Sequence, residues 1–295
     1  MRQVLAVVRY DFRGFLKNPK VILTFFLGIV LCYLLSERIM VVIKGYGTPV
    51  QVAEPFLWTF GDGASVLLSS ILLMLLFSDL PQMGSVTPYY LYRTTKRRWL
   101  FGQMLYVACV VALYTGFLFL VTAALCMRDS YGGNRWSDTA AMLAYSKLGE
   151  DLCVPSTVKV MESTTPYGCM LGVLGLLFFY SLCLSFLILA GNLLSGKKRG
   201  MIGGLFFSLW GFLLDARGLG KLLHLGTHEM YKVNLLVGWI SPLSHVTYGR
   251  HNFGYDKMPA IWQSCLFFLI LLLLLLGLSL GALRRYSFRF LGEES

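Results

Sequence analysis

The 295-residue sequence contains few charged residues, and acidic residues are especially scarce. Charged residues make up 14% of the chain, against about 25% in soluble domains, and only 15 residues are Asp or Glu. Hydrophobic residues make up 56%. A water-soluble globule of this size could not cover its surface with so few polar side chains. The composition therefore excludes a soluble protein and predicts an integral membrane protein.

Histidine is also scarce, which limits the possible chemistry. All four histidines, His224, His228, His245 and His251, lie in the last third of the chain. His224 and His228 have a spacing that suits a metal on one helix face, but Gly226 separates them and no third ligand follows at a fixed spacing. We therefore expect no metal site and interpret the histidines as structural or interfacial. Nothing in the sequence supports a pH-sensing role.

Complete catalytic and nucleotide-binding motifs are absent. Residues 191–198 read GNLLSGKK and approach the phosphate-binding pattern GxxxxGK[ST], but Lys198 replaces the hydroxyl that would bind magnesium. The apolar segments also contain no paired carboxylates, which argues against catalysis and against proton-coupled transport. We therefore expect that this chain is not an enzyme and binds no cofactor, so that any ATP and Mg²⁺ would belong to another chain.

Long apolar runs are the main feature that is present. A helix needs about 20 mostly apolar residues to cross the hydrocarbon core of a membrane. Six segments qualify, two of them only if flanking residues contribute. We therefore predict an all-α integral membrane protein, with one transmembrane domain over residues 1–295. The six predicted spans cover residues 21–43, 63–77, 100–126, 167–194, 201–214 and 259–283.

Basic residues are distributed unevenly among the predicted connections. If both termini lie on one side, that side carries 15 basic and 4 acidic residues, and the other side carries 11 of each. The whole net charge of +11 then lies on the side of the termini. Because Lys and Arg concentrate in cytoplasmic loops, we predict a multi-pass protein of the cytoplasmic membrane with both termini inside. The excess is an orientation signal and does not indicate nucleic-acid binding.

The first 20 residues have an amphipathic pattern and lack the features of a signal peptide. On a helical wheel the basic side chains fill a sector of about 80°, and apolar side chains fill the opposite half. This pattern predicts a helix lying on the anionic inner leaflet. Asp11 falls on the apolar side, where it either snorkels to the edge or contacts a partner protein. The basic residues are Arg2, Arg9, Arg13 and Lys17.

Three connections are longer than simple turns. Residues 79–99 lie on the cytoplasmic side, and their basic, helix-compatible end suggests docking on another protein, with binding to anionic lipid as the alternative. The outer segments are residues 127–166 and 215–258, and the second contains an apolar piece that could form a half-helix in the outer leaflet. The sequence leaves open whether two of the cysteines that face outward form a disulfide. These cysteines are Cys126, Cys153 and Cys169.

Small polar residues form stripes on two predicted spans. Asp62, Ser65 and Ser69 share a face of the second span, and Ser181 and Ser185 share a face of the fourth. Such stripes either form interhelical hydrogen bonds, which is the commoner case, or line a substrate path.

The order of these parts resembles the membrane (permease) subunits of type-2 ABC exporters. A basic amphipathic helix leads into the first of six spans, and the cytoplasmic stretch FSD (77–79) to YRTTKRRWLFGQ (92–103) joins the second and third. The stretch WISPLSH (239–245) precedes the last span. The resemblance covers the whole chain, and its motifs are loose.

The resemblance implies a dimer with a second copy or a paralogous permease, each chain binding a cytoplasmic ABC ATPase. The second and fifth spans would line the path, and residues 215–258 would form outer re-entrant helices. The loop between the second and third spans would hold the coupling helix, although Pro81 and Pro88 depart from the family pattern, as does the long segment 127–166. The docking residues would be Asp79, Pro81, Gln82, Tyr89, Tyr92, Arg93, Arg97 and Arg98.

We therefore expect a permease that moves an amphipathic cargo, such as a peptide antibiotic, a drug or a lipid, because the predicted interior is apolar and has no fixed charges. Two alternatives remain open. One is a membrane enzyme that acts on lipid through His224, His228 or Asp215, and the other is a membrane anchor or sensor that recruits a partner through residues 79–99.

Overall fold

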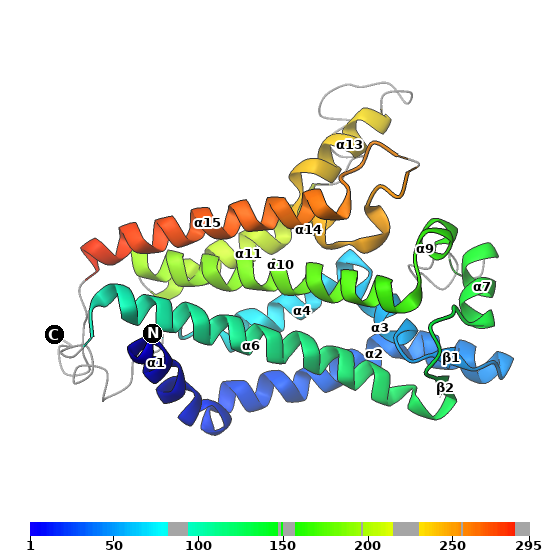
Figure 1. Cartoon of the computed structure of the whole chain (residues 1–295), viewed down its shortest axis with the longest axis horizontal. Helices are drawn as coiled ribbons and strands as arrows, with labels where there is room; N and C mark the ends of the chain where they lie inside the picture. Colours follow the sequence, from blue (N-terminus) through cyan, green and yellow to red (C-terminus); the bar gives the residue numbers. More distant parts are fainter. Residues whose placement is uncertain are drawn as a thin grey trace.

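The structure is a computed structural model that describes residues 1–81, 94–146, 149, 157–195, 197–214, 230–254 and 256–286. Figure 1 shows a bundle of long helices whose axes run roughly along the longest dimension of the molecule. The described residues contain almost no sheet, only a parallel pair of two-residue strands, β1 (Val50–Gln51) and β2 (Ser130–Tyr131). The prediction of an all-α protein is confirmed.

Four helices are long and apolar enough to cross a membrane, and each coincides with a predicted span. They are α2 (Pro19–Tyr46), α6 (Lys96–Leu125), α10 (Pro166–Ser195) and α15 (Ile261–Arg285). Helix α10 is central, because 72% of its apolar stretch is buried in the protein, against 28% for α15. It packs against α15, α6 and the following helix α11 (Lys197–Leu213). An apolar helix buried on most sides forms the core of such a bundle.

The second predicted span, residues 63–77, coincides with a helix that follows a sharp bend in the chain. Helices α3 (Glu54–Phe60) and α4 (Gly63–Leu76) meet at an angle of 83°. Asp62 begins α4 by accepting a hydrogen bond of 3.0 Å from the backbone N–H of Ala64, as an N-cap does. The described residues therefore contain four candidate spanning helices, or five if α3 and α4 form one broken span.

The amphipathic N-terminal segment is helical and packs against α6. Helix α1 (Arg2–Arg13) lies so close to α6 that a Cβ atom on Gly102 would be 2.7 Å from the Cβ of Val7. Phe12 and Tyr106 add an edge-to-face ring contact with centroids 5.1 Å apart. The interface is therefore tight and apolar, with one exception.

That exception is Asp11, which is only 6% exposed and faces α6. Its Oδ2 atom accepts a hydrogen bond of 2.8 Å from Nε2 of Gln103. Asp11 thus neither snorkels to the edge of the helix nor needs a separate protein as its partner, because a polar group of the same chain satisfies it. Burial raises the pKa of the Asp11 carboxyl to about 7, although the hydrogen bond from Gln103 opposes the shift.

Shorter elements gather at the end of the bundle that is far from α1 (Figure 1), which we call the α13 end. Among them, Glu54 of α3 is fully buried and joins two segments. Its carboxylate accepts hydrogen bonds from the backbone N–H of Gln51 (3.0 Å) and from the N–H (2.8 Å) and hydroxyl (2.5 Å) of Ser137. The other short elements at this end are η2 (Met127–Asp129), α7 (Asp138–Tyr145), α9 (Val158–Ser163), α13 (Met230–Ile240), α14 (Pro242–Val246) and η4 (Tyr248–Arg250), whereas η1 (Phe15–Lys17) follows α1 and contacts α1 and α2.

The cysteines in the described part of the chain are free thiols. Cys126 and Cys169 are both buried, and neither is joined to the other. Cys153, the third member of the possible outer disulfide, lies outside the described residues.

Candidate functional site

A cavity of about 630 Å³ lies at the α13 end, where α4, α11, α13 and α14 meet. Its volume falls in the range of about 300–1,000 Å³ that is usual for small-molecule sites. The lining combines apolar, polar and very small residues. They are Leu214, Val237, Leu243 and Met258, then Asp62, Asn234, Thr247 and Arg250, and finally Gly63, Ala64 and Gly211.

Two opposite charges line this cavity, and they come from different elements. Asp62 lies at the N-terminus of α4, where the helix dipole stabilises a carboxylate. Arg250 lies in η4, and its Nη1 donates a hydrogen bond of 3.2 Å to the hydroxyl of Ser244. A cavity with one anion, one cation and apolar walls can hold the headgroup and the apolar part of an amphipathic molecule.

Helix α14, which forms part of the cavity wall, packs closely against glycine residues of two neighbouring helices. A Cβ atom on Gly211 of α11 would lie 2.5 Å from the Cβ of Leu243 in α14, and one on Gly63 of α4 would lie 3.3 Å from Oγ1 of Thr247. The hydroxyl of Ser241 donates to the carbonyl of Gly211 at 3.3 Å. Helix α14 therefore packs directly on the backbones of α4 and α11, at distances that a side chain at Gly211 would prevent.

Of the five residues in the two polar stripes, the structure places only Asp62 at the cavity. Ser65 and Ser69 are buried in the bundle, and the Ser69 hydroxyl bonds within its own helix at 2.9 Å. Ser181 and Ser185 are also buried, and the Ser185 hydroxyl donates to the Ser181 carbonyl at 2.7 Å. Ser69 and Ser185 thus satisfy their hydroxyl groups inside their own helices, as small polar residues in membrane helices commonly do.

Most of the cavity lining carries no signal in the sequence. Arg250 and Asn234 are single polar residues in an otherwise mixed segment, and no spacing rule links them to Asp62. The close approach at Gly211 has no separate signal either, because the sequence around it contains several glycines. The one signal in the sequence is topological, because the second predicted span begins and the fifth ends on the outer side, where residues 215–258 also lie.

Two of the four histidines lie behind the wall of the cavity. His245 and His251 are each 1% exposed, and both contact the hydroxyl of Ser264, at 2.8 Å and 2.9 Å. The other ring nitrogen of His245 faces the Trp239 carbonyl at 2.9 Å, and that of His251 faces the Tyr248 carbonyl at 3.0 Å. Burial lowers the pKa of both imidazoles.

The remaining candidates for metal or catalytic chemistry lie elsewhere. Within the described ranges, no three His, Cys, Asp or Glu side chains are grouped so that they could hold a metal ion. His224, His228 and Asp215, on which the enzyme alternative depends, lie outside the described residues. The nucleotide-like stretch starts at Gly191 inside α10, so an apolar helix precedes it instead of a strand.

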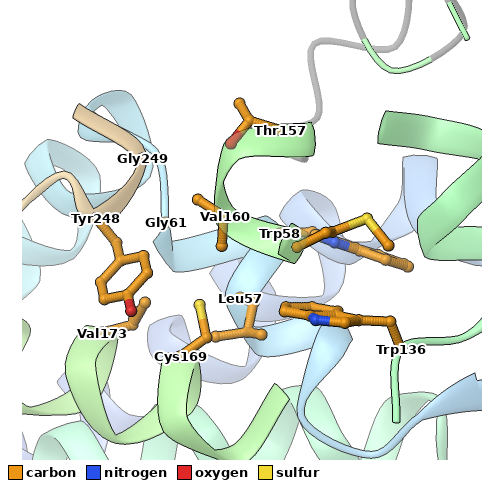
Figure 2. A pocket seen from close by; sticks show the side chains of 11 residues that line it. Leu57, Trp58, Gly61, Trp136, Thr157, Val160, Cys169, Val173, Tyr248 and Gly249 are labelled. Atoms are coloured by element: carbon orange, nitrogen blue, oxygen red, sulfur yellow. The ribbon is translucent and has the colours of Figure 1, made fainter. Parts of the chain in front are cut away.

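A second pocket, of about 20 Å³, lies between α3, α9, α10 and η4 (Figure 2). Trp58 and Trp136 lie together on one side of it, and Cys169 and Tyr248 lie on the other. The indole N–H of Trp136 donates to the carbonyl of Thr164 at 2.7 Å, which fixes its ring. A pocket of this size holds about one water molecule, so it is a packing feature and not a cargo site.

At the α1 end of the bundle, the structure describes only part of the predicted docking loop. Asp79 forms an ion pair of 2.6 Å with Lys20 at the start of α2, and Pro81 is buried. The Lys20 ammonium also donates to the hydroxyl of Ser78 at 2.9 Å. The start of the loop is thus attached to α2. Gln82, Tyr89, Tyr92 and Arg93 lie outside the described residues.

The end of the loop leads directly into α6. Thr95 is the N-cap of this helix, and Arg97 and Arg98 in its first turn are both exposed. The guanidinium of Arg98 donates to Oε1 of Gln3 at 2.7 Å, so it connects α6 with α1. Arg98 therefore lies beside the amphipathic helix. The basic residues of that segment, Arg2, Arg9, Arg13 and Lys17, are all exposed.

The hairpin of α10 and α11 is closed at this same end by Asn192. Its side chain donates to the carbonyl of Leu80 at 2.6 Å and accepts from the backbone N–H of Gly200 at 3.0 Å. Gly191 also packs against Gly200, because a Cβ atom on Gly191 would lie 2.7 Å from the Cα of Gly200. Asn192 thus connects the α10–α11 hairpin with the chain that enters the docking loop.

Comparisons with known proteins add no family to these observations. The chain matches no family model, no curated protein and no solved structure.

Proposed function

We propose that this chain is the permease subunit of a type-2 ABC exporter, which moves an amphipathic cargo with energy from a separate ATPase chain. The observation that carries the proposal is the cavity of about 630 Å³ at the α13 end. It lies where α4 begins and α11 ends, and these are the two helices that the family resemblance assigns to the path. An exporter needs a site of mixed polarity in this position to release or hold an amphipathic molecule.

The lining supports a peptide, drug or lipid more than a small ion. Leu243, Val237 and Met258 offer apolar surface, and Asp62 and Arg250 offer one charge of each sign. A small ion would need several converging ligands of one kind, whereas an amphipathic molecule uses apolar surface and a few polar contacts.

The proposal includes six spans with both termini in the cytoplasm. Helix α11 has 17 residues and α4 has 14, so both need flanking residues to cross about 30 Å of hydrocarbon. With this topology, the whole net charge of +11 lies on the cytoplasmic side. The exposed basic residues of α1 would then lie on anionic lipid headgroups.

The contacts at the α1 end suggest how the ATPase would be coupled. Asp79 is bonded to α2 through Lys20, and Arg98 is bonded to α1 through Gln3. Asn192 adds the α10–α11 hairpin through the Leu80 carbonyl. A partner that moves the loop between Asp79 and Arg98 would therefore act on several helices together. The partners of the complex would be an ABC ATPase, a second permease chain and membrane lipids.

The test is to co-purify this chain with the ABC ATPase encoded beside its gene and to measure ATP hydrolysis in lipid nanodiscs. The charge reversal Arg97→Glu should reduce stimulation of the ATPase several-fold, because Arg97 is exposed in the proposed docking region. Arg128→Glu is the matched control, since Arg128 is exposed at the other end of α6. Failure of any ATPase to associate would refute the exporter proposal, and equal effects of both variants would refute the docking site.

A further inference from the structure

Four polar contacts follow one another through three buried side chains at the α13 end. The series runs from the Trp239 carbonyl to His245 (2.9 Å), to the Ser264 hydroxyl (2.8 Å), to His251 (2.9 Å) and to the Tyr248 carbonyl (3.0 Å). His245 and His251 are 1% exposed and Ser264 is 0% exposed. We call these three side chains the His–Ser–His cluster.

A count of hydrogen atoms shows that the neutral cluster cannot make all four hydrogen bonds. A carbonyl oxygen only accepts, so His245 and His251 must each direct an N–H toward a carbonyl, at Trp239 and Tyr248. The second nitrogen of each neutral ring is then an acceptor, and both of these acceptors face the hydroxyl of Ser264. One hydroxyl has one hydrogen and can donate to only one of them. Four bonds need four hydrogens, and the neutral cluster has three.

One added proton completes the series. If either imidazole is protonated, it donates from both nitrogens, and Ser264 accepts from it while donating to the other ring. The ring of His245 is also stacked on Phe267, with centroids 4.2 Å apart and an interplanar angle of 15°. A cation over an aromatic face is stabilised by the ring quadrupole, so this stack favours a charged His245.

The surroundings oppose a second proton. Two imidazolium rings would lie on either side of one hydroxyl in a buried site, where like charges repel strongly. Lys159 of α9 adds a repulsion toward His251, although it is paired with Asp256 of the segment before α15. Other ionisable groups also lie near the cluster. Tyr248 of η4 contacts the ring of His251 and Cys169 of α10 contacts Tyr248, while Arg250 and Cys265 are the chain neighbours of His251 and Ser264. In the described part of the chain neither imidazole has a carboxylate partner in an ion pair.

We propose that the His–Ser–His cluster is a binding site for a single proton, which the two imidazoles share as one unit. This proton fastens three elements to one another, since Trp239 lies in the last turn of α13, His245 belongs to α14 and Ser264 belongs to α15. The same α13 and α14 form one wall of the 630 Å³ cavity. Acidification would therefore stiffen that wall, and loss of the proton would leave one of the four contacts unmade.

The decisive measurement is histidine NMR on the full chain in lipid nanodiscs. With ¹⁵N- and ¹³C-labelled histidine and the changes His224→Asn and His228→Asn, only the two imidazoles of the cluster remain. Between pH 8 and pH 4.5 we expect the pair to take up one proton and to show coupled shifts of both rings. Two neutral rings at every pH, or two protons taken up independently, would overturn the proposal.

Ser264→Ala provides the comparison, because it removes the hydroxyl and with it the need for a fourth hydrogen. Its pair should have a proton affinity about tenfold lower, the usual effect of losing a hydrogen bond to a charged group. Ser279→Ala is the matched control, since Ser279 is buried in the same helix and bonds only to the Leu275 carbonyl, at 2.8 Å. Equal proton affinities in the two variants would contradict the role of Ser264.

A further variant keeps the test decisive if Ser264→Ala does not fold. Phe267→Leu leaves all four contacts and removes the ring stacked on His245. It should lower the proton affinity of the pair several-fold and leave the uptake of one proton unchanged. An unchanged affinity in this variant would refute the contribution of the stack, and uptake of two protons would refute the shared site.

Discussion

The carboxylate of Asp11 accepts a hydrogen bond of 2.8 Å from the side-chain amide of Gln103, inside the contact between α1 and α6. The two residues are 92 positions apart in the chain. Both are buried, at 6% and 0% exposure, so this polar pair lies within an otherwise apolar interface. It joins the amphipathic helix to a long apolar helix at the end where we propose that an ATPase binds.

The pH dependence of this contact can be tested with Asp11→Asn. Burial raises the pKa of Asp11 to about 7 from an ordinary value of 3.8. Between these values the folded state holds a proton that the unfolded state has lost, so stability is highest at low pH and falls as pH rises toward 7. Asp11→Asn keeps an acceptor for Gln103 and removes the charge. We expect it to raise thermal stability at pH 8 and to change it little at pH 4.

The measurement is thermal unfolding in detergent between pH 4 and pH 8. Asp129→Asn is the control, because Asp129 is exposed. If Asp11→Asn had the same effect at both ends of this range, the carboxyl would not titrate with folding, and our interpretation would be wrong.

Gly102→Ala should loosen α1 from α6. Its new Cβ would lie 2.7 Å from the Cβ of Val7, a distance at which one of the two helices must move. Overpacking of this kind costs about 1–3 kcal/mol. We expect a lower thermal midpoint and faster proteolysis within α1. Gly116→Ala, in the same helix, should behave as wild type, because a Cβ atom there meets nothing within 4 Å.

Glu54→Gln should destabilise the α13 end of the bundle. Glu54 is fully buried and accepts from Gln51 and twice from Ser137, so an amide in its place would direct an NH₂ group toward at least one donor. Leaving such buried groups unsatisfied costs about 1–3 kcal/mol. Thermal unfolding and limited proteolysis near α7 would measure the effect. Glu162→Gln changes an exposed carboxylate of α9 and keeps an acceptor for the hydroxyl of Tyr145, so it should leave both unchanged.

Asp62→Asn and Arg250→Gln test the cavity as a cargo site. Asn is an N-cap as good as Asp, so the first change should preserve α4 and remove only the charge. If the cargo contacts these charges, each change should weaken cargo binding about tenfold, which corresponds to the loss of one charge-assisted hydrogen bond. Binding of labelled candidate cargo to the purified protein is the readout. Arg135→Gln, at an exposed position away from the cavity lining, is the control. Unchanged binding in both cavity variants would remove the cavity from the transport path.

The long helices could be predicted closely from the sequence. Helices α6 and α15 begin within a few residues of the spans predicted at 100–126 and 259–283, because a continuous apolar run is a local property that can satisfy its backbone only as a helix in a membrane. The amphipathic pattern of α1 is likewise local, and the helix over Arg2–Arg13 follows from it. The composition and these patterns were sufficient for the class of protein and for the position of its main helices.

The sites depend on contacts that no local pattern contains. The 83° bend between α3 and α4, the close approach of Gly211 to Leu243 and the bond between Asp11 and Gln103 all join segments whose relative positions are set by packing. The same holds for the His–Ser–His cluster. Its three residues form no recognisable sequence motif, and only the fold brings two imidazoles to one hydroxyl. The positions of the long apolar helices are thus determined by the local sequence. A buried polar site is determined only by the tertiary structure, because it depends on which donors and acceptors the folded chain brings within about 3 Å of one another.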